Sequence, residues 1–164
     1  MAAEVTYRQI VREIALDHHG YVTTKEAAKA GVPAVELPKL AARGGLENVA
    51  YGLYRVPDMP ATANDQFAEA LLRVGEGAYL HGETVLALLG FADVNLRQIK
   101  LTHVRDEVRT TFYDGLVAQP VADAILECRG RIETDRLLDA AKRARGEGLM
   151  TTTEWQRVRK CLRS

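Results

Sequence analysis

Apolar positions recur at three- and four-residue intervals near the start of the chain. Such spacing places the apolar side chains on one side of a helix predicted over about residues 5–17. The apolar residues of that side are Tyr7, Ile10, Val11 and Ile14. Gly20 ends the helix, because glycine adopts the left-handed C-cap conformation without a Cβ clash. Tyr21 and Val22 then form a short extended piece.

Two further helices are expected before residue 45. Thr23 and Glu26 have the Thr-x-x-Glu spacing of a capping box, which predicts a second helix from about Thr24. A turn at Gly31 leads to a third helix over about residues 34–43, in which Pro38 fits only within the first turn. One face of this third helix is apolar, with Leu37, Leu40 and Ala41. The opposite face is charged, with Glu36, Lys39 and Arg43.

Two strands, over residues 46–50 and 53–56, follow the third helix and are joined at Tyr51-Gly52. Three helices followed by such a hairpin indicate a winged helix-turn-helix over residues 1–57, a module that places one helix in the DNA major groove. Lysine and arginine on the third helix can donate to guanine. The residues of the hairpin, or wing, most able to reach phosphate or the minor groove are Asn48, Tyr51 and Arg55.

Each expected contact also has an interpretation that needs no DNA. Lys39 and Arg43 could be ordinary solvated helix residues. Thr23 is expected first as a helix cap, although a threonine hydroxyl can also bind phosphate. The arrangement of the whole segment therefore indicates DNA binding more strongly than any single residue does.

Residues 57–63 contain two prolines and small residues, which favours a linker. A second, small α+β domain is expected over residues 64–164. Its predicted strands are residues 99–104 and a hairpin over 110–118 that turns at Asp114-Gly115. Its predicted helices are residues 64–74, 82–89, 121–128, 134–145 and 152–162. The whole chain is thus predicted to be α+β and mainly helical.

The net charge of zero hides an uneven distribution. Residues 1–56 contain seven Lys/Arg against six Asp/Glu, residues 57–128 five against eleven, and residues 129–164 ten against five. The expected DNA-binding segment is therefore only slightly basic. The basic residues of the last two helices could bind nucleic acid or an acidic protein, or could simply be solvated. They are Lys142, Arg143, Arg145, Arg157, Arg159, Lys160 and Arg163.

Candidate chemistry is sparse. Cys128 and Cys161 do not make a disulfide framework, and the four histidines lack metal-ligand spacing. Glycine-loop nucleotide motifs and the Gly-x-Ser-x-Gly elbow are missing from the sequence, so we predict no cofactor and no enzyme. No apolar run approaches the ~18 to 20 residues of a membrane span, and the first residues lack a signal-peptide pattern. A cytoplasmic protein is expected.

Several segments resemble one family in order along the chain. The segment Thr23–Ala28, the run Ala30-Gly-Val-Pro33, the run Leu40–Gly44 and the run Gly52-Leu-Tyr-Arg55 resemble the N-terminal domain of AbiEi-type antitoxins of type IV toxin–antitoxin systems. A weaker similarity to the second domain of that family continues through residues 81–90, the strand at 99–104 and the closing helices.

The resemblance implies a bacterial repressor that binds inverted repeats in its own promoter and counteracts a nucleotidyltransferase-like toxin. By position, it implies DNA contacts by residues of the second and third helices and of the wing. These residues are Thr24, Lys25, Lys39, Arg43 and Arg55. Two alternatives stay open: a protein-interaction module that uses the winged fold as a scaffold, and a transcription factor without a toxin.

Overall fold

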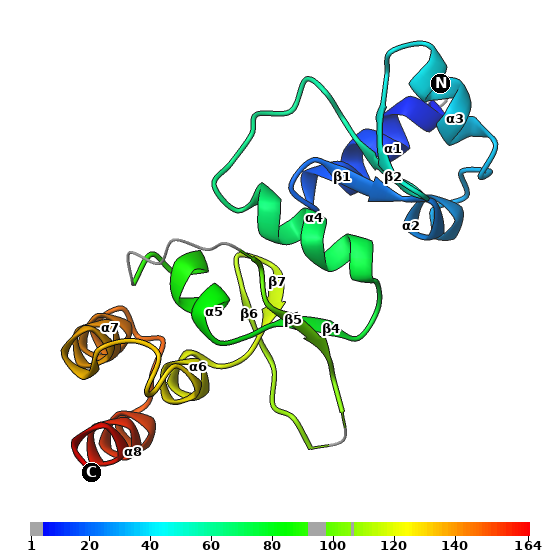
Figure 1. The fold of residues 1–164 in the computed structure, drawn as a ribbon. Coiled ribbons are helices and arrows are strands. Elements are labelled where there is room, and N and C mark those ends of the chain that lie inside the picture. Colours follow the sequence, from blue (N-terminus) through cyan, green and yellow to red (C-terminus); the bar gives the residue numbers. More distant parts are fainter. Residues whose placement is uncertain (1–4, 92–97, 106) are drawn as a thin grey trace. The chain divides into compact units, whose positions relative to one another are not determined.

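The computed structural model describes residues 5–91, 98–105 and 107–164 (Figure 1). It is α+β, as predicted, and divides into two compact units, Met1–Glu76 and Gly77–Ser164. We call them the N-terminal unit and the C-terminal unit. The first four residues of the expected N-terminal domain lie outside the described residues.

The N-terminal unit has the predicted order of elements. Its helices are α1 (Tyr7–Leu16), α2 (Thr24–Lys29), α3 (Glu36–Ala42) and α4 (Asp65–Val74). Its strands are β1 (Tyr21–Thr23), β2 (Glu47–Ala50) and β3 (Leu53–Arg55). These strands form an antiparallel sheet in the order β1-β3-β2, so the strand before α2 pairs with the second strand of the hairpin.

Local sequence determines where the helices of this unit begin and end. Thr6 with Gln9, and Thr23 with Glu26, form complete capping boxes at the starts of α1 and α2. Only the second box was predicted. Gly20 has the predicted left-handed conformation, with a φ of 88°, but the C-cap of α1 is Asp17, three residues earlier. Pro38 lies in the first turn of α3, where its missing N–H costs no intrahelical hydrogen bond.

The core of the N-terminal unit lies between the three predicted helices and the sheet. Val11, Val32 and Leu37 are completely or almost completely buried in it. Tyr7, which was predicted to face this core, is instead 43% exposed, because it is the first residue of α1. Ala15, one helical turn beyond Val11, is completely buried and belongs to the same core at the other end of the helix.

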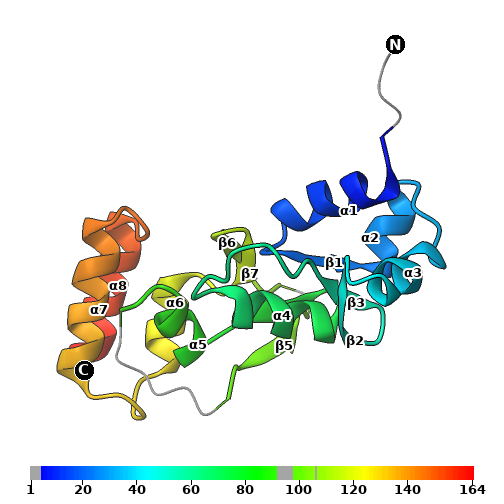
Figure 2. The same cartoon turned by 90° about the horizontal axis from the view of Figure 1, so that it is seen from above.

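Helix α4 belongs to the N-terminal unit, which differs from the predicted boundary at residues 58–63. It packs against β1, and Figure 2 shows α1 and α4 on different sides of that strand. Polar contacts also join α4 to the sheet: the Tyr21 hydroxyl donates to Glu69 at 2.8 Å, and Arg55 pairs with Asp65 at 3.4 Å. The connecting segment at residues 57–63, with its two prolines, therefore does not mark a division between units.

The C-terminal unit contains a four-stranded sheet in the order β5-β4-β7-β6. Its strands are β4 (Ala78–Leu80), β5 (Leu101–His103), β6 (Thr111–Tyr113) and β7 (Leu116–Ala118). Strand β4 was not predicted, because its three residues are all buried and show no alternation. Asp114 and Gly115 have φ values of 50° and 74°, which confirms the predicted two-residue turn between β6 and β7.

Four helices complete the described part of the C-terminal unit. They are α5 (Glu83–Leu88), α6 (Val121–Glu127), α7 (Thr134–Gly146) and α8 (Thr152–Arg163), all within two residues of prediction at each end. Helices α6, α7 and α8 pack against one another, as Figure 1 shows. Cys128 is buried beside α6, and burial raises the pKa of its thiol to about 11, whereas Cys161 on α8 is partly exposed.

We predict that the contact between Tyr21 and Glu69 makes the N-terminal unit sensitive to acid. Burial alone would raise the pKa of Glu69, but hydrogen bonds from Arg73 and Tyr21 outweigh burial and lower this pKa. A carboxyl with a lowered pKa stabilises the fold above its ordinary pKa of about 4.3, and that stabilisation is lost as the pH falls through the folded-state value. Glu69→Gln should therefore cost about 1 kcal/mol at pH 7 and little at about pH 3.

Urea unfolding followed by far-UV circular dichroism at both pH values measures this difference. Glu13→Gln, on the exposed side of α1, is the matched control and should leave the pH dependence unchanged. Equal losses for Glu69→Gln at both pH values would contradict the assignment.

Candidate nucleic-acid interface

The start of α2 is held by two neighbouring threonines. The Thr23 hydroxyl accepts from the Glu26 amide at 3.1 Å, and the Glu26 carboxylate accepts from the Thr23 amide. The Thr24 amide donates to the Gly52 carbonyl at 2.9 Å, and its hydroxyl lies 3.4 Å from the same oxygen. Both predicted contact residues thus have structural partners, and Thr24 joins α2 to the turn of the wing.

Lys25 extends from α2 into solvent, where it meets the end of the N-terminal unit. Its ammonium lies 2.6 Å from the Glu76 carboxylate, and both side chains are more than 60% exposed. The hydrogen bond from Lys25 lowers the pKa of Glu76, so this carboxyl is ionised at neutral pH. An exposed pair of this kind contributes little to stability and can open to release Lys25.

Helix α3 presents its charged face as predicted. Lys39 is half exposed and pairs with Glu36 at 2.9 Å within the same helix. Arg43, the C-cap residue, is exposed and has no side-chain partner among the described residues. Its backbone is fixed by a hydrogen bond from its amide to the Lys39 carbonyl. Arg43 is therefore the cation of this face that is most available to a ligand.

The wing presents an aromatic side chain at its turn. Tyr51 is completely exposed, although a large aromatic side chain is usually at least partly covered. Gly52 next to it has a φ of 66°, a conformation that glycine adopts without strain. Asn48 is also exposed, on β2. Helix α3 contacts β2, so the charged face of α3 and the wing belong to neighbouring elements.

Arg55 does not have the free guanidinium that a phosphate contact requires. Its side chain is only 16% exposed and donates to the carbonyls of Val56 and Met59, in addition to pairing with Asp65. Its guanidinium also lies 5.9 Å from the centre of the Tyr21 ring. The structure gives Arg55 a structural role within the N-terminal unit, and we leave it out of the proposed contact residues.

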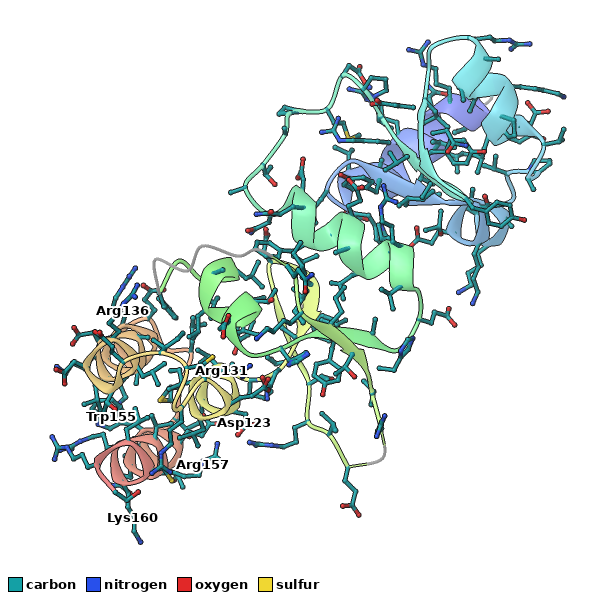
Figure 3. The ribbon with its side chains drawn as sticks, viewed as in Figure 1. Asp123, Arg131, Arg136, Trp155, Arg157 and Lys160 are labelled. Atoms are coloured by element: carbon teal, nitrogen blue, oxygen red, sulfur yellow. The ribbon has the colours of Figure 1, made fainter. Side chains whose placement is uncertain are left out.

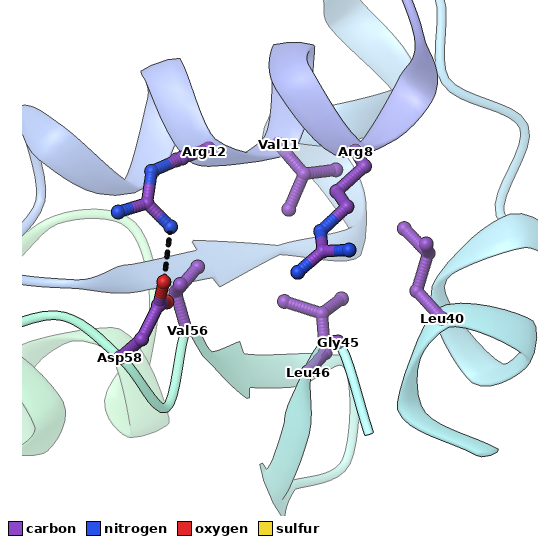
Figure 4. A pocket seen from close by; sticks show the side chains of 8 residues that line it. All are labelled: Arg8, Val11, Arg12, Leu40, Gly45, Leu46, Val56 and Asp58. Atoms are coloured by element: carbon purple, nitrogen blue, oxygen red, sulfur yellow. Dashed lines mark hydrogen bonds and ion pairs between the residues drawn. The ribbon is translucent and has the colours of Figure 1, made fainter. Parts of the chain in front are cut away.

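Two arginines that were not predicted lie along α1. Arg8 and Arg12 are one helical turn apart and border a small pocket whose walls include Leu40 and Leu46 (Figure 4). Arg12 donates to Asp58 at 2.7 Å, and this hydrogen bond, with a smaller effect of Arg8, lowers the pKa of Asp58. The sequence feature that could have identified Arg8 and Arg12 as a pair on one side of α1 is their four-residue spacing.

The basic residues of α7 and α8 form several contacts within the C-terminal unit. Arg143 donates to the Gly90 carbonyl and lies over the Phe91 ring, and Arg159 lies over the Trp155 ring. Arg157 extends from α8 to Asp123 of α6, whereas Lys160 extends away from the neighbouring helices (Figure 3). Fewer basic side chains of α7 and α8 are therefore available to bind a partner than the sequence suggests.

His81 is part of a polar cluster in the C-terminal unit. Its Nδ1 lies 2.8 Å from Glu127, whose other oxygen accepts from Gln119 at 3.1 Å. Burial alone would raise the pKa of Glu127, but the contacts with His81, Gln119 and Arg131 lower it. Within residues 5–91, 98–105 and 107–164, no three His, Cys, Asp or Glu side chains form a group that could hold a metal ion.

The geometry brings together the start of α2, the charged face of α3 and the wing, which are parts of one segment. Residues 9–57 match the model of a family described as transcriptional regulators, AbiEi antitoxins. This match confirms the AbiEi resemblance over the segment that contains every predicted contact residue. Helix α4 and the C-terminal unit lie outside the AbiEi match. No curated protein matches the chain.

Among the described helices, none combines the length and the apolar character needed to cross a membrane.

We predict that the capping box of α2 contributes measurably to the stability of the interface. Thr23→Ala removes the hydroxyl that accepts from Glu26 and should lower the free energy of unfolding by about 1 kcal/mol. Thr23→Ser retains the hydroxyl and should keep most of that stability. Urea unfolding of both variants measures the difference, and equal losses would show that the methyl group matters rather than the cap.

Proposed function

We propose that the N-terminal unit is a winged helix-turn-helix domain that binds double-stranded DNA of its own promoter. The observation that supports this most directly is the exposed guanidinium of Arg43 at the end of α3, which has no side-chain partner in the described part of the chain and lies beside Lys39 on the same face. Arginine and lysine on such a helix can donate to the O6 and N7 atoms of guanine. The AbiEi match supports a regulator, and sequence-specific binding at inverted repeats is the expectation for such a repressor.

The contact residues we propose differ in how directly they reach DNA. Lys39 and Arg43 would enter the major groove, while Lys25, Asn48 and Tyr51 would contact phosphate or the minor groove. Thr23 and Thr24 would place the first amides of α2 rather than donate their hydroxyls, because both hydroxyls already have partners. Lys25 would exchange Glu76 for phosphate on binding.

We further propose that the chain is the antitoxin of a type IV toxin–antitoxin system and counteracts a nucleotidyltransferase-like toxin. The match to AbiEi antitoxins supports this part of the proposal, in which residues 77–164 would form the antitoxin region. Expression of the neighbouring gene with and without this chain tests it. Growth that depends on the chain supports an antitoxin, while no growth defect from the neighbouring gene favours a transcription factor without a toxin.

We predict that the double variant Lys39→Ala/Arg43→Ala binds promoter DNA at least about tenfold more weakly than the unmodified chain. Each side chain that contacts a base contributes about 1–3 kcal/mol of discrimination, and about 1.4 kcal/mol is tenfold in affinity. Fluorescence anisotropy with a duplex from upstream of the gene, at two salt concentrations, measures the loss. Affinity of the unmodified chain should fall steeply with salt, because phosphate contacts release counterions.

The matched control is Arg129→Ala/Lys142→Ala, which removes the same charge from exposed positions of the C-terminal unit. Its affinity for the duplex should stay within about threefold of the unmodified chain. Equal losses for the two double variants would show a general charge effect and would contradict groove contacts by α3. Complete absence of binding at low salt would favour the protein-interaction module.

A further inference from the structure

Helix α4 contacts each strand of the N-terminal sheet through side chains spaced four residues apart. Asp65 pairs with Arg55 of β3, Glu69 accepts from Tyr21 of β1, and Arg73 donates from Nη2 to the Val49 carbonyl of β2 at 3.2 Å. Residues i, i+4 and i+8 lie on one face of a helix. We call Asp65, Glu69 and Arg73 the α4 polar stripe.

The contact with β2 falls at an irregular position of the wing. Asn48 pairs with Tyr54 and Ala50 with Leu53, so Val49 is an extra residue in β2 that forms a β-bulge. A bulge leaves its extra residue without a regular ladder partner and bends the strand. A hydrogen bond from outside the hairpin can therefore determine which way the wing is directed.

Arg73 is suited to that role because one guanidinium joins two groups. Its Nε donates to Glu69 at 2.9 Å, and its Nη2 reaches both Glu69 at 2.7 Å and the Val49 carbonyl. Glu69 is in turn held by the Tyr21 hydroxyl. The position of Val49 is thereby linked to the buried strand β1 through three side chains.

We propose that Arg73 is a positioning residue that directs the wing, and with it Asn48 and Tyr51, toward DNA. Asn48 directly precedes Val49, and Tyr51 follows it after Ala50, so a change in the bend of the bulge displaces both residues without altering α3. The proposal rests on the proposed DNA binding of the N-terminal unit. It assigns a role to α4, which lies beyond residues 9–57, and makes residues 58–76 part of the DNA-binding domain.

A double-mutant cycle tests the proposal with the full chain and the promoter duplex. Arg73→Met should weaken binding about 3- to 10-fold, which is about 0.7 to 1.4 kcal/mol and lies within the net range expected for one ordinary hydrogen bond. In the Asn48→Ala/Tyr51→Ala background the same change should have no further effect, because the wing contacts are already lost. In the Arg43→Ala background its full effect should remain. Equal factors in all three backgrounds would overturn the proposal.

Arg73→Lys separates positioning from charge, because lysine keeps the positive charge but lacks a planar guanidinium that can join Glu69 and Val49. We expect Arg73→Lys to lose affinity in the same direction as Arg73→Met. Affinity equal to that of the unmodified chain would overturn the positioning role.

Hydrogen–deuterium exchange without DNA distinguishes failure of this inference from failure of the proposed function. Arg73→Met should speed exchange in peptides that cover residues 47–55 and leave exchange in α1 unchanged. Gln66→Met, on an exposed position of α4, is the control for a change in the helix itself. Unchanged exchange in 47–55 would overturn positioning by Arg73, whereas absence of DNA binding by the unmodified chain would overturn the proposed function.

Discussion

The ion pair between Arg55 and Asp65 is the interaction on which the arrangement of the N-terminal unit depends most. Both side chains are less than a fifth exposed, so neither charge could be left without a partner at low cost. Asp65 also accepts from Thr62 at 2.6 Å, and Arg55 also donates to two backbone carbonyls of the connecting segment. Burial alone would raise the pKa of Asp65, but the hydrogen bonds that Asp65 accepts from Thr62 and Arg55 lower this pKa and keep the carboxylate charged. The pair thus fixes β3, the connecting segment and the start of α4 together.

Local features were predictable from the sequence, while contacts between distant residues were not. The Thr23 capping box, the φ of Gly20 and the Asp114-Gly115 turn each depend on a few neighbouring residues, and the sequence predicted all three correctly. The place of α4 in the N-terminal unit depends on Tyr21 meeting Glu69, 48 positions away. Hydrophobic periodicity locates a helix but does not identify the strand that it covers.

The candidate site shows the same limit at the level of side chains. Residue type and spacing correctly placed Lys39 and Arg43 on the exposed face of α3 and Tyr51 at the turn of the wing. They did not distinguish these residues from Arg55, which looks equally free in the sequence but is enclosed by Asp65 and Tyr21. Availability of a cation depends on its three-dimensional partners, and the same holds for Arg143 and Arg157 in the C-terminal unit.

The different environments of the two cysteines make the chain suitable for site-selective chemistry. A thiol reacts with maleimides and iodoacetamide as its thiolate, and the raised pKa of buried Cys128 keeps it protonated near neutral pH. Cys161, partly exposed on α8, therefore offers a single attachment point for a fluorophore or spin label without substitution of either cysteine. A probe placed there would report on the last helix while leaving every residue of the N-terminal unit unmodified.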